Sequence, residues 1–136
     1  MRCFLDSNII ISAGLFPNGI PAAALKKALS PPNVAIMCDY SLDEIRRVFK
    51  RKFPDKTEDL ELFLSRLLFS VEFVTTPNEH HNDEIKIRDV NDRPILRAAK
   101  SAGTDILITG DKDFLDSTVT DPKIVTASQF FNNAVF

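Results

Sequence analysis

The sequence predicts an α/β fold in which a central parallel sheet lies between two layers of helices. Short apolar segments alternate with amphipathic helical segments along the chain, and this alternation is typical of a parallel sheet with both faces covered. Residues 2–5 and 105–108 contain apolar runs of the kind that form buried parallel strands. We therefore expect a three-layer α/β/α sandwich.

The length and composition fit a single domain spanning residues 1–136. A hydrophobic content of 44% in 136 residues is enough to bury a continuous core. Charged residues make up 26%, near the average for globular proteins, and no internal repeat is visible. The net charge of −2 argues against a protein that coats nucleic acid non-specifically, because such binding needs a broad basic surface. A local basic strip remains compatible with this charge.

The beginning of the sequence does not fit a signal peptide. Arg2 precedes an apolar stretch, but Asp6 and Asn8 interrupt it and no small-residue cleavage site follows. The sequence also lacks an apolar run of the roughly 18–20 residues that span a bilayer. We expect a cytoplasmic protein without a membrane partner, in which Cys3 and Cys38 act as small buried hydrophobic residues of their strands.

The apolar patterns place most of the elements. We expect strands at residues 2–5, 33–38, 71–74, 105–108 and 123–125. A helix should follow the first strand at Ile9-Ile10-Ile11, and further helices are expected at 41–52, 57–69 and 94–100, the last of these ended by Gly103. Phe130-Phe131 and Val135-Phe136 should dock a C-terminal helix onto the sheet. Residues 77–90 are expected to form a polar loop with solvated His80 and His81.

The helix expected at 57–69 has two large side chains outside its main apolar stripe. Leu62 and Phe69 are one heptad apart, so both lie on the same side of the helix. They would mark a homo-oligomer interface, or they would show that the helix is buried on two sides within its own domain.

Four short acidic segments occupy equivalent positions in the predicted fold. They are FLDSN (4–8), SLDE (41–44), NDRP (91–94) and TGDKD (109–113), and each comes at the end of a strand or the start of the next helix. Residues just past the carboxyl ends of parallel strands share one crevice. We therefore expect Asp6 and Asp111 to be close in space if strands 2–5 and 105–108 are neighbours.

Most of these acids also have a structural explanation. Ser41 and Glu44 fit a capping box at a helix start. Asp92, two residues before a proline, suits a helix N-cap, and Asp113 suits the cap of a short turn. Asp111 follows a glycine, as in many turns. Capping or solvation is thus a sufficient role for each of them individually.

Asp6 is the exception, because it lies between a buried strand and an apolar helix. The shared position of all four segments favours a common function. Several carboxylates within about 4–6 Å raise one another's pKa values and destabilise the fold unless a cation neutralises them. Oxygen ligands without a histidine or cysteine cluster favour Mg²⁺ or Mn²⁺ over zinc, and such ions serve phosphate chemistry.

The ordered set of motifs resembles the PIN-domain ribonucleases, in particular the VapC-like toxins of prokaryotic toxin–antitoxin pairs. Asp6-Ser7-Asn8 is similar to the family's first motif, and Glu44 is similar to the acid in the first turn of the helix after the second strand. Asp92 in NDRPILRAAKSAG matches Asp-x-x-Ile/Leu-x-x-Ala-Ala, and residues 109–114 match Thr-x-Asp-x-Asp-Phe. The resemblance covers nearly the whole chain.

The resemblance implies an endoribonuclease that uses one or two Mg²⁺ or Mn²⁺ ions to hydrolyse RNA. The catalytic metal ligands would be Asp6, Glu44, Asp92 and Asp111, with Asp113 as a further candidate. Ser7, Asn8 and Thr109 would orient these ligands. The RNA backbone would meet the basic side of helix 41–52, which is otherwise only a solvated face: Arg46, Arg47, Lys50 and Arg51. RNA and a cognate antitoxin are the partners that this function implies.

Two assignments and two other functions remain open at this point. Asp43 is an alternative to Glu44, and Asp89 is an alternative to Asp92. A non-catalytic regulatory domain of receiver type would also carry acids at strand ends, but it should have paired acids after the first strand. A domain that only binds an antitoxin is the other alternative, and the complete acidic set argues against it.

Overall fold

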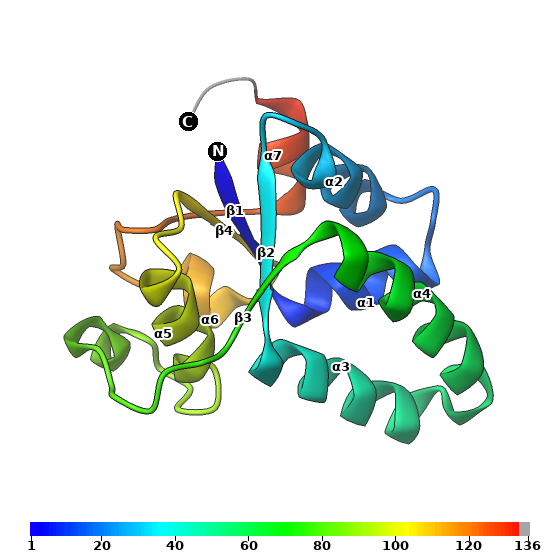
Figure 1. Cartoon of the computed structure of the whole chain (residues 1–136). Coiled ribbons are helices and arrows are strands. Elements are labelled where there is room, and N and C mark those ends of the chain that lie inside the picture. Colours follow the sequence, from blue (N-terminus) through cyan, green and yellow to red (C-terminus); the bar gives the residue numbers. More distant parts are fainter. Residues whose placement is uncertain (134–136) are drawn as a thin grey trace.

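The computed structural model describes residues 1–133, and the predicted three-layer arrangement is confirmed (Figure 1). The parallel sheet has the strand order β3-β2-β1-β4-β5. Its strands are β1 (Arg2–Leu5), β2 (Val34–Cys38), β3 (Glu72–Val74), β4 (Ile106–Ile108) and β5 (Lys123–Val125). Because β1 lies in the middle and pairs with β4, Asp6 and the segment after β4 emerge side by side.

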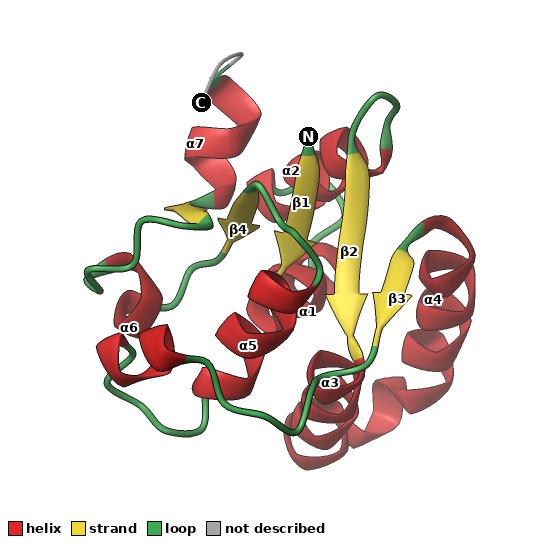
Figure 2. Cartoon of the chain, turned by 60° about the vertical axis from the view of Figure 1, so that its left-hand side comes forward, coloured by secondary structure: helices red, strands yellow, loops and turns green. Residues whose placement is uncertain are grey.

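The helices form a larger layer and a smaller layer on the two faces of the sheet (Figures 1 and 2). The larger layer contains α1 (Ser7–Leu15), α2 (Ile20–Leu29), α3 (Asp39–Lys52), α4 (Thr57–Ser70) and α7 (Ala127–Asn132). The smaller layer contains α5 (Arg93–Ser101) and α6 (Lys112–Leu115). Two 3-10 helices, η1 (Pro54–Lys56) and η2 (Asn82–Lys86), lie in the connections.

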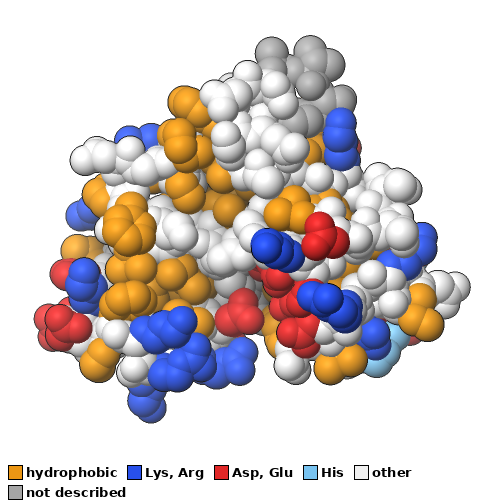
Figure 3. Space-filling model, turned by 180° about the vertical axis from the view of Figure 1, so that it is seen from behind, with side chains coloured by type: hydrophobic (Ala, Val, Ile, Leu, Met, Phe, Trp, Pro, Cys, Tyr) orange, Lys and Arg blue, Asp and Glu red, His pale blue; other side chains and the backbone are white. Residues whose placement is uncertain are grey.

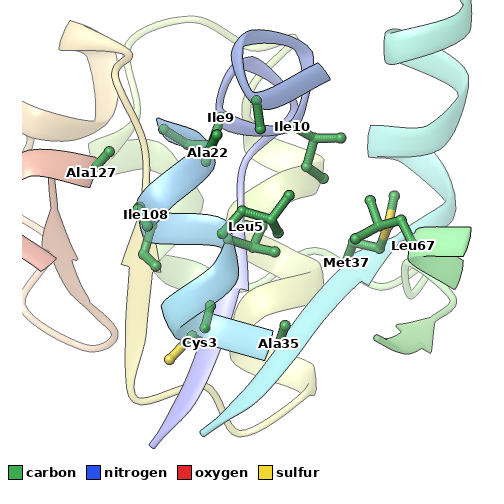
Figure 4. Close-up of a cluster of buried hydrophobic side chains, with 14 of the residues drawn as sticks. Cys3, Leu5, Ile9, Ile10, Ala22, Ala35, Met37, Leu67, Ile108 and Ala127 are labelled. Atoms are coloured by element: carbon green, nitrogen blue, oxygen red, sulfur yellow. The ribbon is translucent and has the colours of Figure 1, made fainter. Parts of the chain in front are cut away.

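Strands β1, β2, β4 and β5 contribute alternate residues to two separate cores. Leu5 and Met37 face the larger layer, where Figure 4 shows them beside Ile10 and Leu67. The smaller layer packs against the other face, which is why the strands read as continuous apolar runs. The side chain of Cys3 belongs to the first core, and burial raises the pKa of its thiol to about 11. This confirms that Cys3 is a small buried hydrophobic residue.

Helix α3 begins two residues earlier than the sequence predicts. Asp39 opens it, and one oxygen of this carboxylate accepts hydrogen bonds from the Tyr40 amide at 2.9 Å and the Thr76 amide at 2.8 Å. Ser41 therefore lies inside the helix, buried, with its hydroxyl 3.4 Å from the Cys38 sulfur. The predicted capping box of Ser41 and Glu44 is wrong, and Glu44 lies in the second turn of α3 instead of the first.

The segment 77–90 is more ordered than the predicted polar loop. It contains η2, where the His81 imidazole accepts a hydrogen bond from the Asp83 amide at 3.0 Å. Glu84 is buried and forms an ion pair with Arg97 of α5 at 2.8 Å. His81 thus caps a short helix, and the buried ion pair holds the segment against the smaller layer.

Helix α2 has no counterpart among the predicted elements. Pro21 lies in its first turn, and the buried face consists of small side chains such as Ala24 and Ala28. Its apolar stripe is therefore weak in sequence, and packing against α1 and α7 supplies the stability. Within residues 1–133, no single helix is long and apolar enough to cross a membrane; α1 and α2 reach that length only as a pair, with a bend of 113° between them.

Helices α4 and α7 settle two expectations at the surface. Leu62 is 56% exposed and Phe69 is 95% exposed, so the alternative in which a second side of α4 is buried within the domain is wrong. Phe130 is buried and docks α7 onto the sheet as predicted, whereas Phe131 is 43% exposed. The other pair predicted to dock, Val135-Phe136, lies outside the described residues.

Candidate active site

The four acidic segments meet at the carboxyl edge of the sheet. Asp6 directly follows β1, and its amide donates to the Ile108 carbonyl of β4 at 3.1 Å. Asp111 follows β4, Asp92 immediately precedes α5, and Glu44 lies on α3, which follows β2. Figure 3 shows acidic side chains gathered in a hollow of the molecule, with Lys and Arg side chains on its sides.

Thr109 connects the first and last acidic segments. Its hydroxyl donates to Asp6 Oδ2 at 2.7 Å and accepts from the Asp111 amide at 3.0 Å. Thr109 is fully buried and Asp6 is 5% exposed, so water does not compete with this bond. The contact fixes the Asp6 carboxylate relative to the turn that carries Asp111.

Asn8 forms a second connection between the same two segments. Its side-chain amide donates to Asp6 Oδ2 at 3.5 Å, and its carbonyl oxygen accepts from the Gly110 amide at 3.2 Å. Ser7 also contacts Asp6, but through its backbone amide, which donates to Asp6 Oδ1 at 2.8 Å. The Ser7 hydroxyl is buried without a hydrogen-bond partner among residues 1–133. Ser7, Asn8 and Thr109 all lie next to the acids that they were predicted to orient.

The capping hydrogen bonds of the acids differ from those expected. Asp6 is the N-cap of α1, and Asp111 is the N-cap of α6, where it accepts from the Asp113 amide at 2.9 Å. The prediction that Asp113 caps this turn is therefore wrong, because Asp111 is the cap. Asp92 occupies the N-cap position of α5, but its side chain makes no capping hydrogen bond within the described chain. Capping thus explains Asp6 and Asp111, while Glu44 and Asp92 are left without it.

Burial, together with the neighbouring acids, shifts the pKa values of Asp6 and Asp92. Burial, together with the charges of Glu44 and Asp111, raises the pKa of Asp6 from 3.8 to about 6, although hydrogen bonds from Thr109 and Ser7 oppose the shift. Burial and a hydrogen bond with Asp111 raise the pKa of Asp92 from 3.8 to about 8, and the charges of Asp111, Asp89 and Asp6 add to the rise. Without a counter-charge, Asp92 therefore keeps its proton at neutral pH.

A compact group of three carboxylates extends the predicted set. Asp89, Asp92 and Asp113 each offer an oxygen atom, and these oxygens lie within 4.8 Å of one another. Asp89 was considered only as a substitute for Asp92, but both lie in the same group. The signal in the sequence was their i, i+3 spacing before α5, which brings the two side chains to one side of a turn.

Two side chains beside the acids were not singled out in the sequence. Tyr40, in the first turn of α3, donates its hydroxyl hydrogen to the Asn91 carbonyl at 2.7 Å and so fastens the segment before α5. Arg88 forms an ion pair with Asp113. Both contacts cross between distant segments, which is why local sequence patterns did not reveal them.

The basic side of α3 is divided between structure and solvent. Arg46 donates to both carboxylate oxygens of Glu61 on α4, at 2.9 and 3.1 Å. This bidentate pair already uses the Arg46 guanidinium. Arg47, Lys50 and Arg51 are exposed, and the charge of Arg47 acts on Tyr40 at the edge of the site. Three of the four predicted basic residues are thus available to bind a polyanion, because Arg46 is already paired with Glu61.

The donor chemistry fits a hard divalent cation. The group of Asp89, Asp92 and Asp113 offers carboxylate oxygens alone, as Mg²⁺ and Mn²⁺ prefer. A cation in this place would also counteract the burial and repulsion that together raise the pKa values of Asp6 and Asp92. The residues present therefore fit the predicted type of metal.

Comparison with known proteins identifies a family and two similar structures. A family model described as PIN domain matches residues 2–113. VapBC2 from Rickettsia felis, solved bound to a DNA fragment from its promoter, is 17% identical with a TM-score of 0.71, over 93% of this chain and 98% of the other. VapC20 from Mycobacterium tuberculosis, a Sarcin-Ricin loop cleaving toxin, is 15% identical with a TM-score of 0.60, over 84% and 93%. No curated protein matches the sequence.

Proposed function

The chain belongs to the PIN domain family, and from that premise we propose that it is a metal-dependent endoribonuclease that hydrolyses phosphodiester bonds of RNA. One observation carries this proposal beyond family membership. Acids from four separate segments share the carboxyl edge of the sheet, where burial, a hydrogen bond with Asp111 and repulsion from the neighbouring acids together raise the pKa of Asp92 to about 8. A purely structural set of caps would not require such repulsion, whereas a cation site would.

The proposed metal ligands are drawn from the acids at this edge. Asp6, Glu44, Asp92 and Asp111 are the catalytic set, and Asp113 and Asp89 complete the group on the α5 side. Bound Mg²⁺ or Mn²⁺ would supply Lewis-acid activation of a water and charge neutralisation at the scissile phosphate. The chain's own contribution is orientation: Thr109, Ser7 and Asn8 hold both oxygens of Asp6 in place by hydrogen bonds.

We assign the basic side of α3 to the RNA backbone. Arg47, Lys50 and Arg51 are exposed on α3, the same helix that carries Glu44 toward the acids. Each phosphate that they contact should make binding more sensitive to salt. Arg46 contributes less, because it is paired with Glu61.

The proposed biological role is that of a VapC-like toxin acting in the cytoplasm. Its support is the similarity in fold to VapC20, a Sarcin-Ricin loop cleaving toxin, and to VapBC2, which was solved on promoter DNA. The corresponding partner would be a cognate antitoxin. Induced expression should then arrest bacterial growth, and co-expression of a cognate antitoxin should restore growth.

The test of the proposed function is cleavage of a mixed RNA pool by the purified protein. We expect cleavage with Mg²⁺ or Mn²⁺ and its loss with EDTA, because the carboxylates alone repel the phosphate backbone. The control is the Asp6→Asn variant, in which Asn still caps α1 but has lost the ligand charge. Equal cleavage in EDTA would refute the metal mechanism. Metal binding without any cleavage would favour a non-catalytic domain that binds an antitoxin.

A further inference from the structure

Arg88 brings a permanent positive charge to the acidic site. It lies between η2 and α5, and its guanidinium donates to Asp113 Oδ1. The Arg88 side chain is 84% exposed, whereas that of Asp113 is only 17% exposed. Because a guanidinium keeps its proton in proteins, one member of the three-carboxylate group is already paired with a cation of the chain itself.

The backbone around Arg88 is held while its side chain extends into solvent. On one side, Ile87 is fully buried and its carbonyl accepts from Arg93 Nε at 2.9 Å. On the other side, the Tyr40 hydroxyl holds the Asn91 carbonyl. The backbone of Arg88 is therefore held in place, and only its side-chain torsions need to change when the guanidinium releases Asp113.

A divalent cation and Arg88 compete for the same carboxylate. A cation held by Asp89, Asp92 and Asp113 would bind the same carboxylate group to which the Arg88 guanidinium donates. Two positive charges on one carboxylate repel each other. Cation binding therefore favours release of Arg88 from Asp113.

We propose that Arg88 is a counter-ion that changes partner, neutralising Asp113 in the metal-free site and moving to an RNA phosphate once a divalent cation is bound. This inference rests on the proposed function. The guanidinium matches a phosphate in bidentate geometry, and phosphate is the anion that a nuclease brings to this edge. The exchange couples metal binding to substrate binding, because the Arg88 guanidinium that the metal displaces from Asp113 then contacts the RNA phosphate.

The first arm of the test measures metal binding without RNA. Mn²⁺ is titrated calorimetrically into the wild-type protein, Arg88→Gln and Arg66→Gln. Arg66 is exposed on α4, so its substitution makes the same change in net charge outside the acidic site. Arg88→Gln should bind Mn²⁺ at least threefold more tightly than the wild type, and Arg66→Gln should match the wild type. Equal affinities of the two variants would overturn the proposal.

The second arm separates substrate binding from chemistry. With saturating Mn²⁺, Arg88→Gln should raise KM for RNA at least threefold, leave kcat within twofold, and lower the salt dependence of binding by about one phosphate contact. KM of Arg88→Lys should lie between those of the wild type and Arg88→Gln, because lysine keeps the charge but loses the bidentate geometry. An unchanged KM in Arg88→Gln would overturn the transfer to phosphate.

Failure of the proposed function would look different. A wild-type protein that binds no Mn²⁺ would overturn both the metal mechanism and the role of Arg88. A wild-type protein that binds Mn²⁺ but cleaves no RNA would refute the nuclease and the transfer to phosphate. In that case a tighter Mn²⁺ affinity in Arg88→Gln than in Arg66→Gln would still support the counter-ion role, which is measured independently of cleavage.

Discussion

The Thr109 hydroxyl donates a hydrogen bond of 2.7 Å to Asp6 Oδ2, although 103 positions separate the two residues in the sequence. The same hydroxyl oxygen accepts from the Asp111 amide. One small side chain therefore sets the relative positions of two proposed metal ligands from opposite ends of the matched domain. Removal of the Thr109 hydroxyl should therefore affect RNA cleavage more than the stability of the fold.

Thr109→Val should impair cleavage strongly and destabilise the fold moderately. Valine keeps the shape but loses the donor that lowers the pKa of Asp6, so this pKa should rise above about 6. The buried carboxylate also loses a partner, which costs about 1–3 kcal/mol of unfolding free energy. Cleavage rates against pH and urea unfolding measure the two effects. Thr109→Ser, which keeps the hydroxyl, should behave like the wild type; equal loss in both variants would point to packing instead.

Charge-neutral replacements of the acids should separate capping from metal binding. Glu44→Gln and Asp92→Asn should abolish most cleavage and the rise in melting temperature that Mn²⁺ causes in the wild type. In the metal-free state both variants should be at least as stable as the wild type, because Glu44→Gln removes a charge that acts on Asp6, and Asp92→Asn removes a charge beside Asp111 once the pH exceeds about 8. Thermal melts with and without Mn²⁺ test this. Normal cleavage by either variant would remove that residue from the site.

The same design applies to the two acids that act as caps. Asp6→Asn and Asp111→Asn should keep the helix starts, since asparagine caps about as well as aspartate. Both should still lose cleavage. A matched control is Asp39→Asn at the start of α3, where the carboxylate accepts hydrogen bonds from the Tyr40 amide and the Thr76 hydroxyl. This variant should lose stability and retain metal-dependent cleavage.

The metal-free protein should become less stable as the pH rises from about 4 to 8. The unfolded chain loses the Asp6 and Asp92 protons near 3.8, whereas the folded chain keeps them until pH values of about 6 and about 8. The folded state binds more protons in this window, so the free energy of unfolding falls by about 1.4 kcal/mol per pH unit for each retained proton. Saturating Mn²⁺ should remove this fall. A metal-free stability that rises through the window would contradict the shifted pKa values.

The exposed side of α4 should mediate self-association. Replacing Leu62 and Phe69 by serine should lower the apparent mass in size-exclusion chromatography and leave the circular dichroism spectrum unchanged, because both side chains are exposed. Leu64, a buried residue of the same helix, provides the contrast: Leu64→Ser should unfold the protein or destabilise it by about 2–5 kcal/mol. An unchanged mass in the double variant would remove the interface.

The sheet was predictable because burial on both faces leaves a simple signal. The apolar runs at 2–5 and 123–125 match β1 and β5, and the other strands differ by one residue at one end. The start of α3 was missed for a tertiary reason. Asp39 is fixed by Thr76, 37 residues away, and that contact outweighs the local capping pattern at Ser41.

The candidate site was predictable as a place but less so in its details. Parallel strands bring the ends of β1 and β4 together whatever the side chains do, so the sharing of one edge followed from fold class. The individual roles depended on backbone geometry. Asp6 turned out to be a cap and Asp92 carries no cap bond among residues 1–133, because the chain enters α5 at Asp92 with a helical backbone conformation.

The central position of β1 makes the order of synthesis important. β1 is flanked by β2, which follows soon after it in the sequence, and by β4, which is translated about a hundred residues later. Until Ile106–Ile108 emerges from the ribosome, one edge of β1 is unpaired and Asp6 has neither Thr109 nor Asp111 beside it. An incomplete chain therefore carries part of the acidic edge but not the assembled site. The proposed nuclease would therefore have a complete site only after translation has passed β4.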